Sequence, residues 1–148
     1  MIKIEFPPEM SRDDEVEILF AEPVEGGFRL ENSPFYVYGV SYLDVVAADA
    51  GSDRWLFTHV KKRSGHSTYR ILLNGKHQEA EFKTRWPALE ILGCTYEEGG
   101  KPEHRLYAID IPPDADVHEA YRLLEQGEND GAWLFEEGHH DSGVPDHQ

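Results

Sequence analysis

Residues 104–135, HRLYAIDIPPDADVHEAYRLLEQGENDGAWLF, decide the fold, because they read in turn as a strand, a helix and a strand. The apolar run within 104–111 predicts the first strand, and Pro112-Pro113 ends it because proline cannot donate to a strand ladder. Residues 116–127 place apolar side chains on one helical face, with an aspartate at 114 or 116 as the cap. Residues 132–135 are apolar again and predict a final strand.

Upstream of this segment the chain predicts one more helix and a short strand. Apolar side chains recur at helical spacing within residues 78–93. Pro87 conflicts with a continuous helix, since a proline in a helix interior costs about 3 kcal/mol. We therefore expect the helix to restart near Thr84. Residues 94–98 then predict a strand.

Residues 54–62 and 68–73 predict a β-hairpin. The turn between them, RSGHS, is rich in small polar residues and contains a glycine that can take a positive φ. With this hairpin, the order from residue 68 to residue 136 becomes β-α-β-β-α-β. That order is typical of a ferredoxin-like fold.

The first ~50 residues carry strand patterns separated by glycine and proline breaks. Residues 2–6 alternate apolar and polar side chains, and Val16, Ile18 and Phe20 alternate with Glu17 and Leu19. This two-residue period indicates strands. The segment therefore predicts a small, strongly bent β-sheet or partial barrel.

Together these patterns predict an α+β protein of two lobes in one globular unit. Residues 1–53 form a β-rich N-terminal lobe packed on residues 54–137, the hairpin plus a ferredoxin-like α+β lobe. Residues 138–148 are polar and predict a flexible tail. The apolar runs are too short to span a bilayer, no export signal is evident, and Cys94 is the single cysteine, so we expect a cytoplasmic protein.

The charge is strongly negative but unevenly distributed. The net charge is −15, yet residues 54–76 contain six Lys and Arg side chains and no acid. An acidic chain of this kind repels nucleic acid and anionic membranes, and it favours encounter with a basic partner. Solubility alone would also account for the charge.

The segment Ser64-Gly65-His66-Ser67-Thr68 is the most suggestive candidate site. Its backbone N–H groups and flanking cations can bind a phosphate or carboxylate, and His66 can act as a general base. The alternative is a turn whose hydroxyls satisfy local backbone groups. The candidate binding residues are Arg63, Ser64, His66, Ser67, Thr68 and Arg70, together with Tyr38, Tyr42 and Asp44 from the preceding aromatic segment.

Other chemistries are not supported by the sequence. It shows no nucleophile elbow and no phosphate-binding glycine loop, and Cys94 is best read as a small buried apolar residue. His139-His140-Asp141 and Asp146-His147 are read as parts of a solvated tail rather than as a metal site. We therefore predict no catalytic residue, no metal and no cofactor.

Several phrases of the sequence resemble a known bacterial family. They are AEP at 21–23, NSPF at 32–35, YGVSYLDVV at 38–46, RSGHSTYR at 63–70, LGC at 92–94, DIPPD at 110–114 and WLFEEG at 133–138. Together they are similar to the bacterial domain of unknown function 4265 family. The resemblance implies a small bacterial domain and assigns no activity.

Two classes of function remain open. The leading hypothesis is an acidic binding protein, of the immunity or antitoxin type, that neutralises a toxin domain with a basic surface by occluding its active site. The alternative is a small-molecule domain that binds an anionic ligand, or acts on it, at the SGHST turn. Small size, acidity and the lack of a catalytic motif favour the first.

Overall fold

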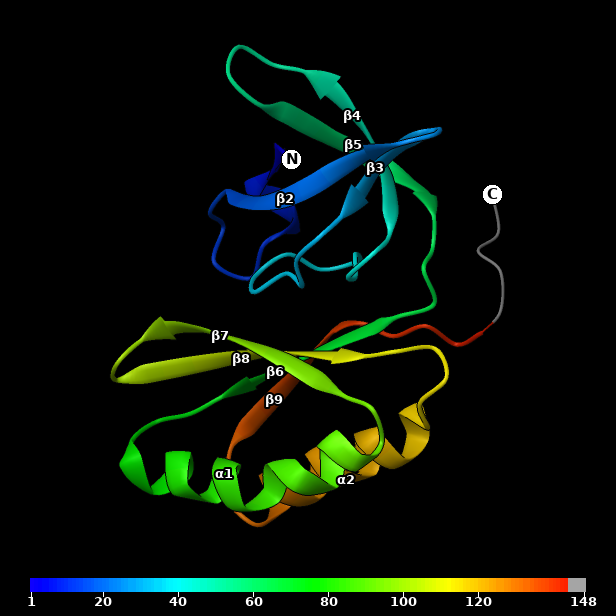
Figure 1. Ribbon diagram of the computed structural model, residues 1–148. Helices are drawn as coiled ribbons and strands as arrows, with labels where there is room; N and C mark the ends of the chain where they lie inside the picture. Colours follow the sequence, from blue (N-terminus) through cyan, green and yellow to red (C-terminus); the bar gives the residue numbers. More distant parts are fainter. Residues whose placement is uncertain (144–148) are drawn as a thin grey trace.

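The computed structural model describes residues 1–143 and shows two lobes. One is a closed five-stranded barrel, and the other is a four-stranded sheet with two helices. In Figure 1 the barrel lies above the sheet and both helices lie below it, so the sheet has one face toward each. Within the described residues, no helix is long and apolar enough to cross a membrane.

The barrel is built from the first five strands in chain order. Neighbouring strands run antiparallel, and the first strand closes the barrel by pairing in parallel with the fifth. Two register shifts in the last antiparallel pair add to the curvature. The strands are β1 (Ile2–Phe6), β2 (Glu17–Val24), β3 (Gly27–Leu30), β4 (Val45–Ala50) and β5 (Trp55–Lys62).

Strand β2 presents the unexpected side of its alternation to the barrel core. Leu19 is buried, whereas the apolar side chains of Ile18 and Phe20 are exposed. Glu17 also points inward, because its carboxylate accepts the backbone N–H groups of residues 35–37 at 2.8–3.0 Å. Three such bonds compensate for burying the carboxylate and fix the register of the strand.

The second lobe follows the predicted order β-α-β-β-α-β from residue 67 onward. Its sheet has the strand order β7-β8-β6-β9, and all pairs are antiparallel. The elements are β6 (Ser67–Leu72), α1 (Lys76–Ile91), β7 (Thr95–Lys101), β8 (His104–Ile111), α2 (Val117–Asn129) and β9 (Leu134–His139).

The predicted hairpin of residues 54–62 and 68–73 is wrong. Strand β5 pairs with β1 and β4 in the barrel, whereas β6 pairs with β8 and β9 in the other sheet. Five of the six residues of β6 are buried, as expected for a strand with partners on both sides and layers on both faces. The change of sheet therefore occurs at residues 63–66 rather than at 53–54.

Helix α1 is continuous, so the predicted restart near Thr84 is also wrong. Pro87 lies inside the helix on its exposed side. Phe82 and Leu89, on either side of the proline, are both buried. Their packing holds the two halves of the helix in line, and this outweighs the unfavourable helix propensity of proline.

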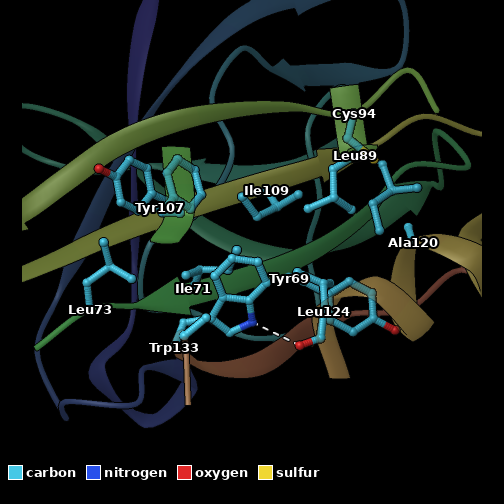
Figure 2. Packing of buried hydrophobic residues seen from close by; sticks show 13 residues of the cluster. Tyr69, Ile71, Leu73, Leu89, Cys94, Tyr107, Ile109, Ala120, Leu124 and Trp133 are labelled. Atoms are coloured by element: carbon cyan, nitrogen blue, oxygen red, sulfur yellow. Dashed lines mark hydrogen bonds between the residues drawn. The ribbon is translucent and has the colours of Figure 1, made fainter. Parts of the chain in front are cut away.

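The core of the second lobe lies between the sheet and the helices. Figure 2 shows Ile71 of β6, Ile109 of β8 and Leu124 of α2 converging on Trp133, with the indole N–H donating to the Leu124 carbonyl at 2.9 Å. Helix α2 begins at the predicted cap, since the Asp116 side chain accepts the backbone N–H of residue 119 at 3.0 Å. The core is therefore packed with apolar side chains, and the buried indole N–H of Trp133 has a hydrogen-bond partner.

The chain remains ordered beyond the predicted start of the tail at residue 138. His139 of β9 pairs with Thr68 of β6, and the backbone N–H of Asp141 donates to Ser67 Oγ at 2.8 Å. Within residues 1–143 no three His, Cys, Asp or Glu side chains are grouped to hold a metal ion. The predicted tail residues Asp146-His147 lie outside the described residues.

Helix α2 requires glycine at position 127. A Cβ there would lie 2.2 Å from ring atoms of Trp133. We expect Gly127→Ala to lower the free energy of unfolding by about 1–3 kcal/mol through overpacking, although alanine is the better helix former. Urea unfolding followed by tryptophan fluorescence measures this. Gln126→Ala, an exposed neighbour, is the control, and a Gly127→Ala protein as stable as this control would contradict the packing.

Candidate functional site

Residues 63–66 form the connector between the lobes, and they contain three of the nine predicted site residues, Arg63, Ser64 and His66. The connector leaves β5 of the barrel and enters β6 of the sheet. Gly65 has φ +91°, and a Cβ at this position would lie 2.9 Å from Pro113. The connector therefore requires glycine both for its backbone conformation and for its close approach to the segment after β8.

Asp44 ties the connector to the barrel. Its fully buried carboxylate accepts the backbone N–H of Ser64 at 2.8 Å and that of Ser41 at 2.9 Å. Arg63 Nη1 lies 3.3 Å from the same carboxylate and donates to the Gly39 carbonyl at 2.6 Å. A buried carboxylate with these donors is satisfied internally, so Asp44 acts in positioning the connector.

The hydroxyl groups of the segment also bond within the protein. Ser64 Oγ donates to the Tyr42 carbonyl at 2.7 Å, and Thr68 Oγ1 lies 2.7 Å from Ser41 Oγ. Ser67 Oγ accepts a backbone N–H of the segment after β9. These hydroxyls join the connector to both lobes, as expected of a turn that satisfies its own surroundings.

His66 forms a pair with Asp110 of β8. Nδ1 of His66 lies 2.8 and 3.0 Å from the two carboxylate oxygens, and the two side chains are only 12% and 10% exposed. Burial raises the pKa of the Asp110 carboxyl above its ordinary value, and the nearby His66 opposes that shift. The contact fixes the imidazole through Nδ1 and directs Nε2 to any second partner.

Arg70 lies between the lobes with its side chain fully buried. Its Nε donates to Glu136 of β9 at 3.1 Å, and Nη1 donates to the carbonyls of Val37 and Pro34 at 2.9 and 3.3 Å. The guanidinium also lies over the ring of Tyr38, 4.9 Å from its centroid. Arg70 is thus bonded on several sides and is not available to an external anion.

Glu136 collects several donors around this arginine. Its carboxylate accepts the Tyr38 hydroxyl at 2.6 Å and a hydrogen bond from Arg12. Gly138 leaves room for the group, because a Cβ there would lie 2.7 Å from Arg70 Nη1. The Gly138 carbonyl also accepts the Gly39 N–H at 2.9 Å, which is a direct backbone hydrogen bond between the lobes.

Two clefts flank the connector. The connector cleft, about 490 Å³, and the interlobe cleft, about 450 Å³, share Pro112 as a lining residue. The connector cleft is lined by Arg63, Ser64, Gly65, Ser67 and Asp141, among others, and the interlobe cleft by Glu31, Ser33, Tyr42, Glu97 and Asp110. The His66–Asp110 pair lies at the junction, since Gly65 and Ser67 line one cleft and Asp110 the other.

The structure thus divides the predicted site residues into two groups. Arg63, Ser64, His66, Ser67, Thr68, Tyr42 and Asp44 meet around the connector, whereas Arg70 and Tyr38 meet around Glu136.

Sequence reasoning missed Asp110 and Glu136, the acidic partners of the two groups. Asp110 carried a signal, because an aspartate inside an apolar strand is unusual. For Cys94 the prediction of a buried residue is confirmed, and burial raises the pKa of its thiol to about 11.

These features define a two-lobed α+β domain whose barrel and helix-covered sheet are held together by buried polar bonds. The chain belongs to the family described as "Domain of unknown function (DUF4265)", which matches residues 12–135. The predicted resemblance is therefore confirmed. No curated protein matches the chain.

A solved structure shares this fold. It is described as a "Novel crystal structure of a hypothetical protein from Neisseria gonorrhoeae" and superposes with a TM-score of 0.74. The similarity covers 95% of this chain and 96% of that one, at 19% sequence identity. At this identity the likeness establishes the fold alone.

The buried Arg70 should dominate the attachment of the two lobes. Arg70→Met is expected to lower the free energy of unfolding by about 3 kcal/mol, because it removes one partner of a buried ion pair. Arg12 and Tyr38 still bond Glu136 in this variant. Thermal and urea unfolding measure the loss. The control Arg122→Met removes an exposed pair with Glu119 and should change little. Equal stabilities of the two variants would show that Arg70 is not the link.

Proposed function

We propose that the protein is an acidic binding protein of the immunity or antitoxin type, which occludes the active site of a toxin domain with a basic surface. The observation that carries this proposal is the inward position of two of the three arginines in the cation-rich segment, residues 54–76. Arg70 is buried against Glu136, and Arg63 is bonded to Asp44 and Gly39. An acidic exterior is complementary to a basic partner and accelerates their encounter.

Two related assignments belong to this proposal. We propose that the second lobe is ferredoxin-like, supported by its antiparallel strand order β7-β8-β6-β9 and its element order. We also propose a cytoplasmic location, supported by the free and buried Cys94, because unpaired cysteines are typical of reducing compartments.

The proposal predicts a stoichiometric complex with a basic protein. The tagged full-length chain, purified from cells that naturally produce it, should carry one dominant partner with a high isoelectric point. The association rate of the purified pair should fall steeply with added salt, because exposed charges are screened beyond about 10 Å at 0.1 M. Stopped-flow mixing at two ionic strengths measures this, with the tag alone as the purification control. Absence of any stoichiometric partner would count against the proposal.

A second candidate function is a small-molecule site at the connector, which binds an anionic ligand or catalyses a reaction of it. A specific observation favours it, namely a cleft at the predicted turn with the His66–Asp110 pair beside it. Among the described lining residues of the connector cleft, Arg63 is the one cation and Asp141 the one acid. The one positive and one negative charge in this lining support anion binding less strongly than the six cations of residues 54–76 suggested.

Inorganic phosphate is the simplest probe of this second candidate. If the connector cleft binds anions through His66, phosphate should raise the Tm of the wild-type protein, and His66→Gln should abolish the increase. His59→Gln, on the exposed side of β5, is the matched control and should retain it. Differential scanning fluorimetry over a phosphate series provides the measurement. A shift of the same size in His66→Gln would remove His66 from the site.

A further inference from the structure

Three large apolar side chains are exposed on the same outer face of the barrel. Ile18 and Phe20 of β2 are 40% and 44% exposed, and Leu56 of β5 is 42% exposed. The register places Ile18 opposite Glu5 of β1, and Glu5 opposite Leu56. Neighbouring strands lie about 4.8 Å apart, so Ile18 and Leu56 are separated by about 10 Å across Glu5.

The same row continues with an acid on the next strand. Asp49 of β4 lies opposite Leu56, so the order across four strands is Ile18, Glu5, Leu56 and Asp49. In the adjacent row, Phe20 lies opposite Lys3, whose ammonium is 5.9 Å from the ring centroid. The face thus carries three apolar side chains, two acids and one lysine, and we call these six residues the barrel face.

Within residues 1–143, these three side chains do not belong to the hydrophobic core of the barrel. The barrel core is filled by the opposite series, which includes Ile4, Phe6 and Leu19. Two other exposed apolar residues, Ile91 and Tyr121, lie on the helices of the second lobe. Apolar side chains gathered on one exposed face with polar residues between them are typical of a contact surface.

The arrangement also restricts how a partner can bind. The barrel is closed, so the backbone groups of β1, β2 and β5 are engaged in pairing with neighbouring strands. A partner therefore contacts this face through side chains rather than by adding a strand. A second copy of the chain would bring acids against acids on a molecule of net charge −15.

We propose that the barrel face is the docking surface for a basic protein partner, one that presents apolar side chains flanked by lysine or arginine. This inference rests on the proposed function and specifies where the partner binds. Phe20 and Leu56 supply the apolar contacts. Glu5 and Asp49 supply negative charge on this face, which Lys3 and Arg54, whose Nε lies 3.6 Å from Glu5, offset. The preference for a basic partner therefore comes mainly from the net charge of −15.

Site-specific photo-cross-linking tests the docking surface. A photoreactive phenylalanine analogue replaces Phe20 or Leu56 in the full-length chain, expressed in its natural cells, and replaces Ile91 or Tyr121 as controls on the other lobe. Cross-linked peptides are identified by mass spectrometry. We expect one protein to be captured at Phe20 and Leu56 and not at the controls, through a peptide with net positive charge.

Binding of the purified partner then provides a quantitative readout. Phe20→Ser and Leu56→Ser should each weaken the Kd about tenfold or more, whereas Ile91→Ser, at an 86% exposed position, should leave it unchanged. Asp49→Asn should lower the association rate and its salt dependence. Far-ultraviolet circular dichroism and the Tm of each variant establish that it is folded, and the cross-linking result does not depend on these variants.

The outcomes separate this inference from the proposed function. Capture of a basic partner at Ile91 or Tyr121 but not at the barrel face would overturn the docking surface and leave the proposed function standing. Capture at the barrel face through an acidic or neutral peptide would overturn the charge selection. Absence of a captured protein at all four positions would overturn both.

Discussion

The guanidinium group of Arg70 lies at the junction of the two lobes, and the arrangement of the whole chain depends on its being satisfied there. Removing such a group from water is costly unless hydrogen bonds and an opposite charge replace the lost hydration. β9 supplies the charge through Glu136, and the loop before β4 supplies carbonyls at residues 34 and 37. Together with the Ser41–Thr68 and Gly39–Gly138 bonds, this side chain fixes the distance and orientation between the barrel and the sheet.

The same logic extends to the connector and to Glu17. In each case a charged side chain compensates for backbone groups of a segment distant in sequence: Asp44 for the N–H of Ser64, and Glu17 for those of residues 35–37. Several polar residues of the predicted ligand site therefore also form hydrogen bonds between distant parts of the fold. Charge-assisted bonds of this kind are strong and directional, which suits them to setting one relative position of two small lobes.

This use of polar residues bears on function, because it turns much of the most distinctive sequence segment inward. The acidic exterior, the barrel face and the two clefts beside the connector then remain as surfaces open to a partner or ligand. Ile18 and Phe20 are exposed for the same reason that Glu17 is buried. Once the carboxylate is directed inward by three backbone donors, the alternation of β2 places its neighbours outside.

Local patterns by themselves determined the order of elements in the second lobe, the cap of α2 at Asp116 and the end of β8 before Pro112, because these depend on neighbouring residues. The tertiary structure alone decided that β5 and β6 lie in different sheets, that α1 continues through Pro87 and that β2 turns Ile18 and Phe20 outward. Each of these outcomes rests on contacts between distant segments. Period and propensity describe a strand or helix, but its partners and its buried side are selected by the packing and hydrogen bonds of the complete fold.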